Sequence, residues 1–174
     1  MYNIEKNKKV GEKVVIYTDG SAHPNPGPGG FGVLVLDKDE KNEYNIIVEC
    51  YSKQFNNRVT NNEMELKALL YSFLNYGINI NNKEFVEIPV VYSDSSYAIN
   101  TLTNWMFSWA KNGWIKSDKK VPENLEIIKA YYEWYQKGYR IELRKVKGHA
   151  GNKYNEIVDK LATGKITVEE IMNG

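Results

Sequence analysis

Four acidic residues stand where their carboxylates could act together. Asp19 and Asp94 each follow a short β-prone run, and Glu65 and Asp159 lie inside segments with a helical pattern of apolar residues. If the two β-prone runs are neighbouring parallel strands, Asp19 and Asp94 emerge at the same edge of a sheet, where α/β proteins generally bind ligands. The sequence therefore predicts a ligand-binding edge that carries at least two carboxylates.

Taken one at a time, these acids have simpler explanations. An aspartate before a glycine, as in Asp19-Gly20, is usually a turn residue. Glu65 near a helix start could be solvated or could stabilise the helix terminus, and Asp159 could be an ordinary surface carboxylate. No single acid therefore supports a functional conclusion.

The elements that must position these acids follow from the hydrophobic pattern. β-prone runs separated by turn residues predict strands at 14–17, 31–36, 44–51, 85–92 and 141–146. The first three strands should form an antiparallel meander, because only a charged turn at 37–42 separates the second from the third. Residues 23–30 are rich in proline and glycine, so we expect a loop without regular structure there.

Helices are predicted at 60–77, from residue 96 onward, at 122–136 and at 152–162. Three strands followed by alternating helices and strands indicate an α/β domain with a mixed five-stranded sheet and helices on both faces. This domain should span 14–163, between a polar N-terminal extension at 1–13 and a C-terminal tail at 164–174.

The bulk composition limits the class of protein. The 174 residues suit one domain with one core. The 42% hydrophobic and 26% charged residues are typical of a soluble globular protein. The net charge of +1 does not by itself indicate a nucleic-acid-binding protein, so that argument depends on local charge.

The cysteine count and the terminus bear on the compartment. One cysteine, Cys50, excludes an internal disulfide and fits a reducing compartment, and we interpret it as a small core or strand residue. The lysine-rich N-terminus lacks the apolar part of a signal peptide, and no apolar run reaches the ~20 residues of a membrane-spanning helix. We expect a soluble cytoplasmic protein.

Four short motifs surround the acids and occur in a fixed order. They are Tyr17-Thr18-Asp19-Gly20-Ser21, Thr60-Asn61-Asn62-Glu63-Met64-Glu65-Leu66, Tyr92-Ser93-Asp94-Ser95 and Val146-Lys147-Gly148-His149-Ala150-Gly151, the last followed by Asp159. Together they closely resemble the type 1 ribonucleases H, especially the bacterial form, over residues 14–162. The resemblance implies a ribonuclease H-like fold and an endonuclease that hydrolyses the RNA strand of an RNA–DNA hybrid, leaving 5′-phosphate and 3′-hydroxyl ends.

The resemblance also implies that Asp19, Glu65, Asp94 and Asp159 bind two Mg2+ ions, which Mn2+ could replace. Four acids in one cleft repel one another and raise their pKa values, and hard cations with oxygen ligands relieve this repulsion. By similarity, Asp19 bridges both ions and Asp159 holds the ion that activates the attacking water. Glu65 and Asp94 then hold the ion that stabilises the leaving 3′ oxygen.

A lone loop histidine is usually only solvent-exposed, but His149 stands in one of the four motifs. The resemblance implies that His149 assists proton transfer or product release, because imidazole titrates near neutrality. We expect its loss to slow turnover without abolishing it. His23 has no such context, and we interpret it as an ordinary loop residue.

Recognition of the RNA strand depends on the 2′-hydroxyl, which an amide can both donate to and accept from. The resemblance implies that Asn25 and Asn61 contact RNA, although Asn61 could equally be a helix cap. Ser96 stands where bacterial relatives often have a glutamine that contacts RNA. Because serine is shorter, this contact could be weaker or could pass through water.

The resemblance assigns Arg58, Thr60 and Asn62 to the DNA strand or its phosphate, since a helix N-terminus with a hydroxyl suits a phosphate. Residues 104–120, here called the basic segment, contain four lysines and one acid, a local charge of +3. The resemblance implies a protrusion that grips the DNA strand, with Trp105 near the sugar backbone and with Lys111, Lys116, Lys119 and Lys120.

A simpler interpretation of the basic segment is that its tryptophans belong to the core beside a solvated lysine loop. Ala110, Asn112 and Ile115 also stand where bacterial relatives often have basic residues. We therefore expect weaker hybrid affinity than that of the most basic relatives.

Two other functions compete with a hybrid-specific nuclease. A non-catalytic hybrid-binding module should lack at least one of the four acids, and all four are present. A related DNA-processing nuclease, or a domain detached from a reverse transcriptase, is disfavoured by the asparagines, the His149 motif and the basic segment. Nothing in the sequence requires more than a monomer.

Overall fold

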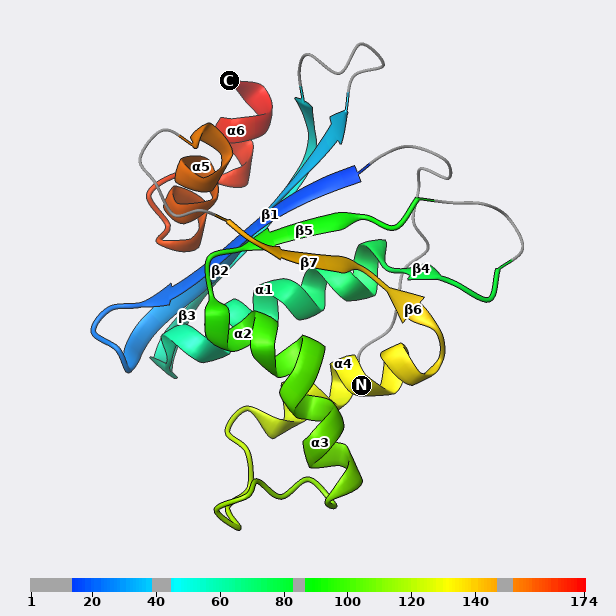
Figure 1. Cartoon of the computed structure of the whole chain (residues 1–174). Helices are drawn as coiled ribbons and strands as arrows, with labels where there is room; N and C mark the ends of the chain where they lie inside the picture. The colour runs from blue at the N-terminus through cyan, green and yellow to red at the C-terminus, as the bar shows by residue number, and fades with distance from the viewer. Residues whose placement is uncertain (1–13, 39–44, 83–86, 147–151) are drawn as a thin grey trace.

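The computed structural model describes residues 14–38, 45–82, 87–146 and 152–174. Three long strands come first, and shorter strands then alternate with helices (Figure 1). In chain order the elements are β1 Val14–Ala22, β2 Gly27–Lys38, β3 Asn45–Val59, α1 Asn61–Tyr76, β4 Ile78–Asn79, β5 Val90–Ser93, α2 Ser96–Asn100, the π-helical turn η1 Thr101–Trp105, α3 Met106–Lys111, α4 Leu125–Gln136, β6 Tyr139–Arg140, β7 Glu142–Lys145, α5 Lys153–Ala162 and α6 Val168–Asn173.

The main sheet has five strands in the order β3-β2-β1-β5-β7. The β1–β2 and β2–β3 pairs are antiparallel, and the β1–β5 and β5–β7 pairs are parallel. The predicted mixed five-stranded sheet, with its antiparallel meander, is confirmed. β4 and β6 form a separate two-stranded sheet.

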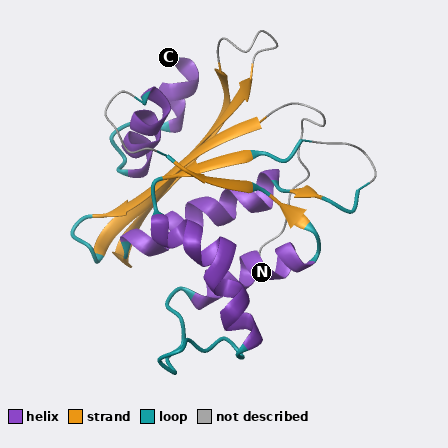
Figure 2. Cartoon of the chain, in the orientation of Figure 1, coloured by secondary structure: helices purple, strands orange, loops and turns teal. Residues whose placement is uncertain are grey.

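Helices cover both faces of the main sheet, with α1 on one side and α5 and α6 on the other (Figure 2). Alternate residues of a strand point to opposite faces. Val33 and Val35 of β2 therefore pack into the core beneath α1 and α4, whereas Leu34 and Leu36 pack against α5. Cys50 lies in β3 and is buried in this second core, as predicted.

The prediction of an irregular loop at 23–30 is wrong in its second half. β2 begins at Gly27, and Gly29 and Gly30 are paired on one side with β1 and on the other with β3. The two neighbouring strands supply hydrogen bonds and fix the backbone, which outweighs the weak strand propensity of glycine. The irregular connection is limited to residues 23–26.

Some element boundaries also differ from the predictions. β3 extends to Val59, because β2 offers it a pairing partner over nearly its whole length. β5 begins only at Val90, and residues 87–89 before it are irregular. The tail after residue 163 contains α6, which Thr167 and Glu170 cap reciprocally.

None of the helices in the described ranges has the combination of length and apolar composition that crossing a membrane requires.

Candidate active site

Three elements bring Asp19, Glu65 and Asp94 together. Asp19 lies in β1, and Asp94 follows β5, which runs parallel to β1 with Tyr17 opposite Tyr92. The two aspartates therefore lie at one edge of the sheet, as the sequence predicted. Glu65 comes from α1, and one carboxylate oxygen of each acid lies within 4.8 Å of the other two. We call these three residues the acidic cluster.

The close approach of α1 to β1 depends on Gly20. A Cβ atom at this position would lie 2.4 Å from the carbonyl carbon of Met64 and 2.5 Å from the backbone nitrogen of Glu65. Only glycine fits here, and the resulting close approach of α1 to β1 places Glu65 beside Asp19.

Two hydrogen-bond donors fix the buried carboxylates. The backbone N–H of Gly20 donates to Asp19 Oδ1 over 2.9 Å and to Glu65 Oε1 over 3.1 Å. The buried hydroxyl of Ser93 donates to Glu65 Oε2 over 3.4 Å. Gly20 and Ser93 lie within the sequence motifs, next to Asp19 and Asp94, but the motifs alone predicted no role for them.

Burial and like charge raise the pKa values of the cluster. Asp19 and Glu65 are 7% and 6% exposed, whereas Asp94 is exposed. Burial is the main cause that raises the pKa of Asp19 to about 7, and the charges of Asp94 and Asp159 add to it. Burial together with Asp19 and Asp94 raises the pKa of Glu65 well above its ordinary value.

This environment suits a divalent cation. The repulsion between crowded carboxylates is relieved either by protons or by a bound cation, which replaces the protons and neutralises the negative charge. The donor set consists of carboxylate oxygens, which hard cations such as Mg2+ prefer. The acidic cluster therefore fits a divalent metal ion.

Asp159 lies close to the cluster but is not one of its three mutually close acids. It is exposed on α5, and its hydrogen bond and charge both raise the pKa of Asp19. Asp159 is thus a neighbour of Asp19, although α5 packs on the sheet face opposite to the one that α1 covers. His149 lies outside the described residues.

Asn25 and Asn61 link the end of β1 to the start of α1. Asn61 Oδ1 accepts a hydrogen bond from the backbone N–H of Ala22 over 2.7 Å, and Asn25 Oδ1 accepts one from the N–H of Asn61 over 3.1 Å. Both side-chain oxygens are therefore engaged. Within the part of the chain that the structure describes, neither side-chain NH2 group donates to the protein.

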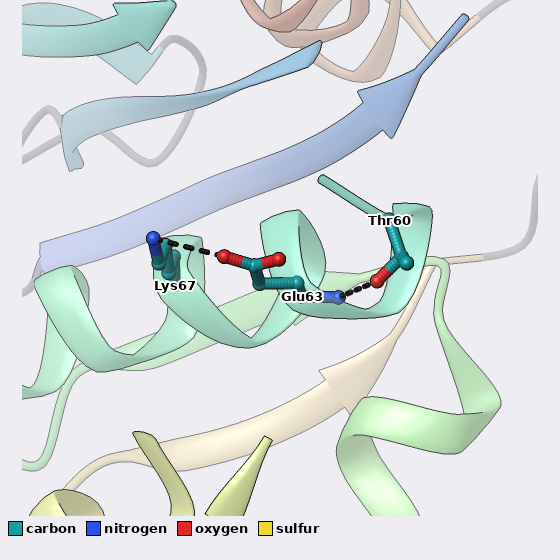
Figure 3. Close-up of polar contacts among 3 residues, drawn as sticks. All are labelled: Thr60, Glu63 and Lys67. Carbon is teal, nitrogen blue, oxygen red and sulfur yellow. Dashed lines mark hydrogen bonds and ion pairs between the residues drawn. The ribbon is translucent and has the colours of Figure 1, made fainter. Parts of the chain in front are cut away.

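Thr60 is the N-cap residue of α1, so Asn61 is not the helix cap that the sequence allowed it to be. The Thr60 side chain accepts a hydrogen bond from the N–H of Glu63 over 3.1 Å, and Glu63 forms an ion pair with Lys67 at 3.1 Å (Figure 3). Nearby, Arg58 is exposed on β3 and Asn62 is partly exposed in the first turn of α1.

A pocket of about 510 Å³ lies beside the basic segment, and we call it the aromatic pocket. Its lining residues are Tyr97, Trp105, Trp109, Lys116, Ser117, Asp118 and Glu123. Trp105 is 39% exposed, and its ring centroid lies 6.2 Å from that of Trp109. Sequence reasoning missed Tyr97 and Ser117, because their place in this pocket depends on the path of residues 112–124.

The basic segment combines the two interpretations given above. Trp109 and Trp114 are partly buried against the core, as the simpler interpretation expected, whereas Trp105 is exposed. Among the predicted lysines, Lys116 lines the aromatic pocket and lies 3.8 Å from Asp118. The other three are exposed on the same segment: Lys111, Lys119 and Lys120.

Ser96 is the first residue of α2 and is exposed. Its hydroxyl accepts a hydrogen bond from Lys145 Nζ at the end of β7. The short serine side chain thus contacts a lysine from another strand, Lys145 of β7.

Comparisons with known proteins agree with this geometry. Residues 11–167 match the family model described as RNase H. The chain is 40% identical over 156 residues to the ribonuclease H of Thermoanaerobacter pseudethanolicus, covering 88% of this chain and 89% of that protein. It is also 40% identical over 162 residues to the ribonuclease H of Caldanaerobacter subterraneus subsp. tengcongensis, covering 91% and 94% of the two chains.

Solved structures give the same likeness. LC9-RNase H1, described as a type 1 RNase H with the type 2 active-site motif, superposes with a TM-score of 0.68 at 27% identity, covering 92% of this chain and 76% of that one. LC11-RNase H1, solved in complex with an RNA/DNA hybrid, has a TM-score of 0.52 at 24% identity, covering 92% and 99%, which is a likeness of fold alone.

Proposed function

Because this chain belongs to the ribonuclease H family, it is a hydrolase that acts on RNA–DNA hybrids, and we propose that it cuts the RNA strand internally, leaving 5′-phosphate and 3′-hydroxyl ends. The observation that carries this proposal is the acidic cluster, whose three carboxylate oxygens lie within 4.8 Å of one another. All three acids come from one chain, so the site requires no second copy, and we propose that the protein acts as a monomer.

We further propose that Asp19, Glu65, Asp94 and Asp159 hold two Mg2+ ions. When bound, such ions lower the pKa of a water molecule and stabilise a leaving oxygen. The chain's own contribution is to hold the ligands in place: Gly20 and Ser93 fix the Glu65 carboxylate. The proximity of Asp159 to Asp19 supports its inclusion.

His149 completes the proposed catalytic set. It precedes α5, the helix that carries Asp159. Its imidazole would take up or release a proton near neutral pH and so assist the reaction or the departure of the product. Its loss should lower the rate without abolishing cleavage.

Two groups of residues would distinguish the strands of the hybrid. The side-chain NH2 groups of Asn25 and Asn61, which donate to no other described residue, can donate to a ribose 2′-hydroxyl. The DNA strand would lie over Trp105 in the aromatic pocket, with Arg58, Thr60, Asn62 and the lysines of the basic segment near its phosphates.

Substrate choice tests the proposal. Labelled RNA–DNA hybrid, double-stranded RNA and double-stranded DNA are each incubated with the protein, with Mg2+ or with a chelator. We expect cutting of the RNA strand of the hybrid only, and only with Mg2+. Binding without cutting would indicate a hybrid-binding module, and cutting of duplex DNA would indicate a DNA-processing nuclease.

A further inference from the structure

We propose that Lys145 is a substrate-positioning residue that binds a phosphate of the RNA strand beside the scissile bond, with Ser96 orienting its ammonium group. This inference rests on the proposed function, because it needs a polynucleotide held at the acidic cluster. It assigns a role to a residue outside the predicted set and accounts for the serine at position 96.

The sheet register places Lys145 next to the acidic cluster. Lys145 is the last residue of β7 and lies opposite Ser93 of β5. Ser93 is the residue whose hydroxyl donates to the Glu65 carboxylate. The backbone of Lys145 is therefore one strand away from a direct partner of the cluster.

The side chain of Lys145 turns towards the same rim as Asp94. Its Nζ donates to the hydroxyl of Ser96, which stands two residues after Asp94 at the start of α2. Ser95 caps this helix by accepting from the N–H of Ala98, so Ser96 sits on a fixed turn. The hydrogen bond thus brings an ammonium group from β7 to the start of α2, two residues after the exposed Asp94.

The ammonium group of Lys145 remains available for an anion. Among the described residues, no carboxylate oxygen lies within 4.0 Å of its Nζ, whereas neighbouring Arg144 is paired with Glu142. A lysine ammonium has three donors, and the Ser96 hydroxyl takes only one of them. Since Lys145 is exposed, the other two can reach a ligand.

A phosphate is the ligand that fits this position. Asp94 is the exposed acid of the cluster, so a polynucleotide would approach from its side. The phosphates that flank the scissile one belong to the same strand, which is the RNA. A flexible lysine suits such a contact, because it offers a point charge without demanding one fixed geometry.

The test measures hybrid cleavage by Lys145→Gln at several salt concentrations, with Lys145→Arg, Ser96→Ala and the control Lys137→Gln. Lys137 is an exposed lysine that pairs with Glu133 on α4. We expect Lys145→Gln to raise KM roughly 3- to 10-fold with kcat within twofold, and to lower the salt slope of log KM by about 0.7–0.9. Lys145→Arg should largely restore both values, Ser96→Ala should have a smaller effect, and Lys137→Gln should have none.

A merely structural role would change different quantities. If Lys145→Gln lowers the melting temperature while KM and the salt slope stay at wild-type values, the proposal is wrong. It is also wrong if only the Mg2+ requirement changes, because Lys145 would then act on the acids and not on the hybrid. An inactive wild-type protein would overturn the proposed function itself, whereas an active one with an insensitive Lys145 would overturn this inference alone.

Discussion

Asp94 differs from Asp19 and Glu65 in being exposed, so its charge can be removed at little cost to the fold. We expect Asp94→Asn to reduce hybrid cleavage at least 100-fold, since an amide replaces a ligand oxygen that carries charge. Its melting temperature and its affinity for the hybrid should stay close to those of the wild type. Cleavage assays with Mg2+, thermal unfolding and a binding assay check these three outcomes.

The control for Asp94→Asn is Glu126→Gln, which removes an exposed carboxylate from the first turn of α4. This variant should cut the hybrid at the wild-type rate. Full activity of Asp94→Asn would remove Asp94 from the active site. An equal loss in both variants would point to a general effect of charge.

The buried Asp19 predicts how stability depends on pH in the absence of metal. Burial, with a smaller contribution from Asp94 and Asp159, raises the pKa of Asp19 from 3.8 to about 7, so the folded protein binds more protons than the unfolded chain between these values. The free energy of unfolding should therefore fall as the pH rises from 4 to 7. Asp19→Asn should lack this contribution and be more stable than the wild type at pH 8, by an amount on the order of 2 kcal/mol.

Denaturant unfolding of both proteins at pH 5 and pH 8, with a chelator, measures this difference. Adding Mg2+ at pH 8 should stabilise the wild type and not Asp19→Asn, since the metal replaces the missing protons. A wild-type protein that loses no more stability than Asp19→Asn between the two pH values would contradict the prediction.

At the scale of elements, the contact between β1 and α1 determines whether the acidic cluster forms. A Cβ at Gly20 would lie 2.4–2.7 Å from three backbone atoms of Met64 and Glu65. Gly20→Ala should therefore push α1 away from β1, costing roughly 1–3 kcal/mol of stability. Cleavage should fall at least 10-fold because Glu65 moves with the helix, as measured by denaturant unfolding and initial rates.

Gly113→Ala is a suitable comparison, because its Cβ would meet no atom within 4 Å while its φ of +69° is unfavourable for alanine. It should lose stability by roughly 1–2 kcal/mol from backbone strain alone. If it lowers cleavage at saturating hybrid as much as Gly20→Ala does, the loss in both reflects instability and not the position of Glu65.

The elements that sequence predicted well are those with strong local signals. The apolar stripe and the Thr60 cap predicted 60–77, and α1 is Asn61–Tyr76; the last long helix, predicted at 152–162, is Lys153–Ala162. The errors occur where a distant partner decides the structure. Gly27–Gly30 become a strand only because β1 and β3 lie on either side of them. α6 was missed although the Thr167–Glu170 capping pattern could have revealed it.

The candidate site was predictable to the same extent. The motifs pointed to Asp19, Glu65 and Asp94, which the fold brings together. The motifs gave no sign that Lys145 would meet Ser96, because that contact depends on the register between β5 and β7. Local sequence patterns thus fail to predict residues whose contacts depend on strand register or on the path of a loop.

For the whole molecule, the position of positive charge matters more than its sum. The net charge is only +1, yet the basic segment carries a local +3 beside the aromatic pocket. Each phosphate that a lysine neutralises adds about 0.7–0.9 to the salt slope of the binding constant. A hybrid that binds across this segment should therefore bind with a salt dependence that the net charge does not suggest.

Two double variants separate local from total charge. Lys119→Gln with Lys120→Gln removes two exposed charges from the basic segment, and Lys137→Gln with Lys165→Gln removes two exposed charges from the end of α4 and the turn after α5. The first pair should lower the salt slope of hybrid binding by about 1–2 and weaken binding several-fold at low salt, with kcat at saturation unchanged. The second pair should leave both values near wild type. Equal effects of the two pairs would mean that total charge governs binding, and the DNA strand would then have no assigned place at the aromatic pocket.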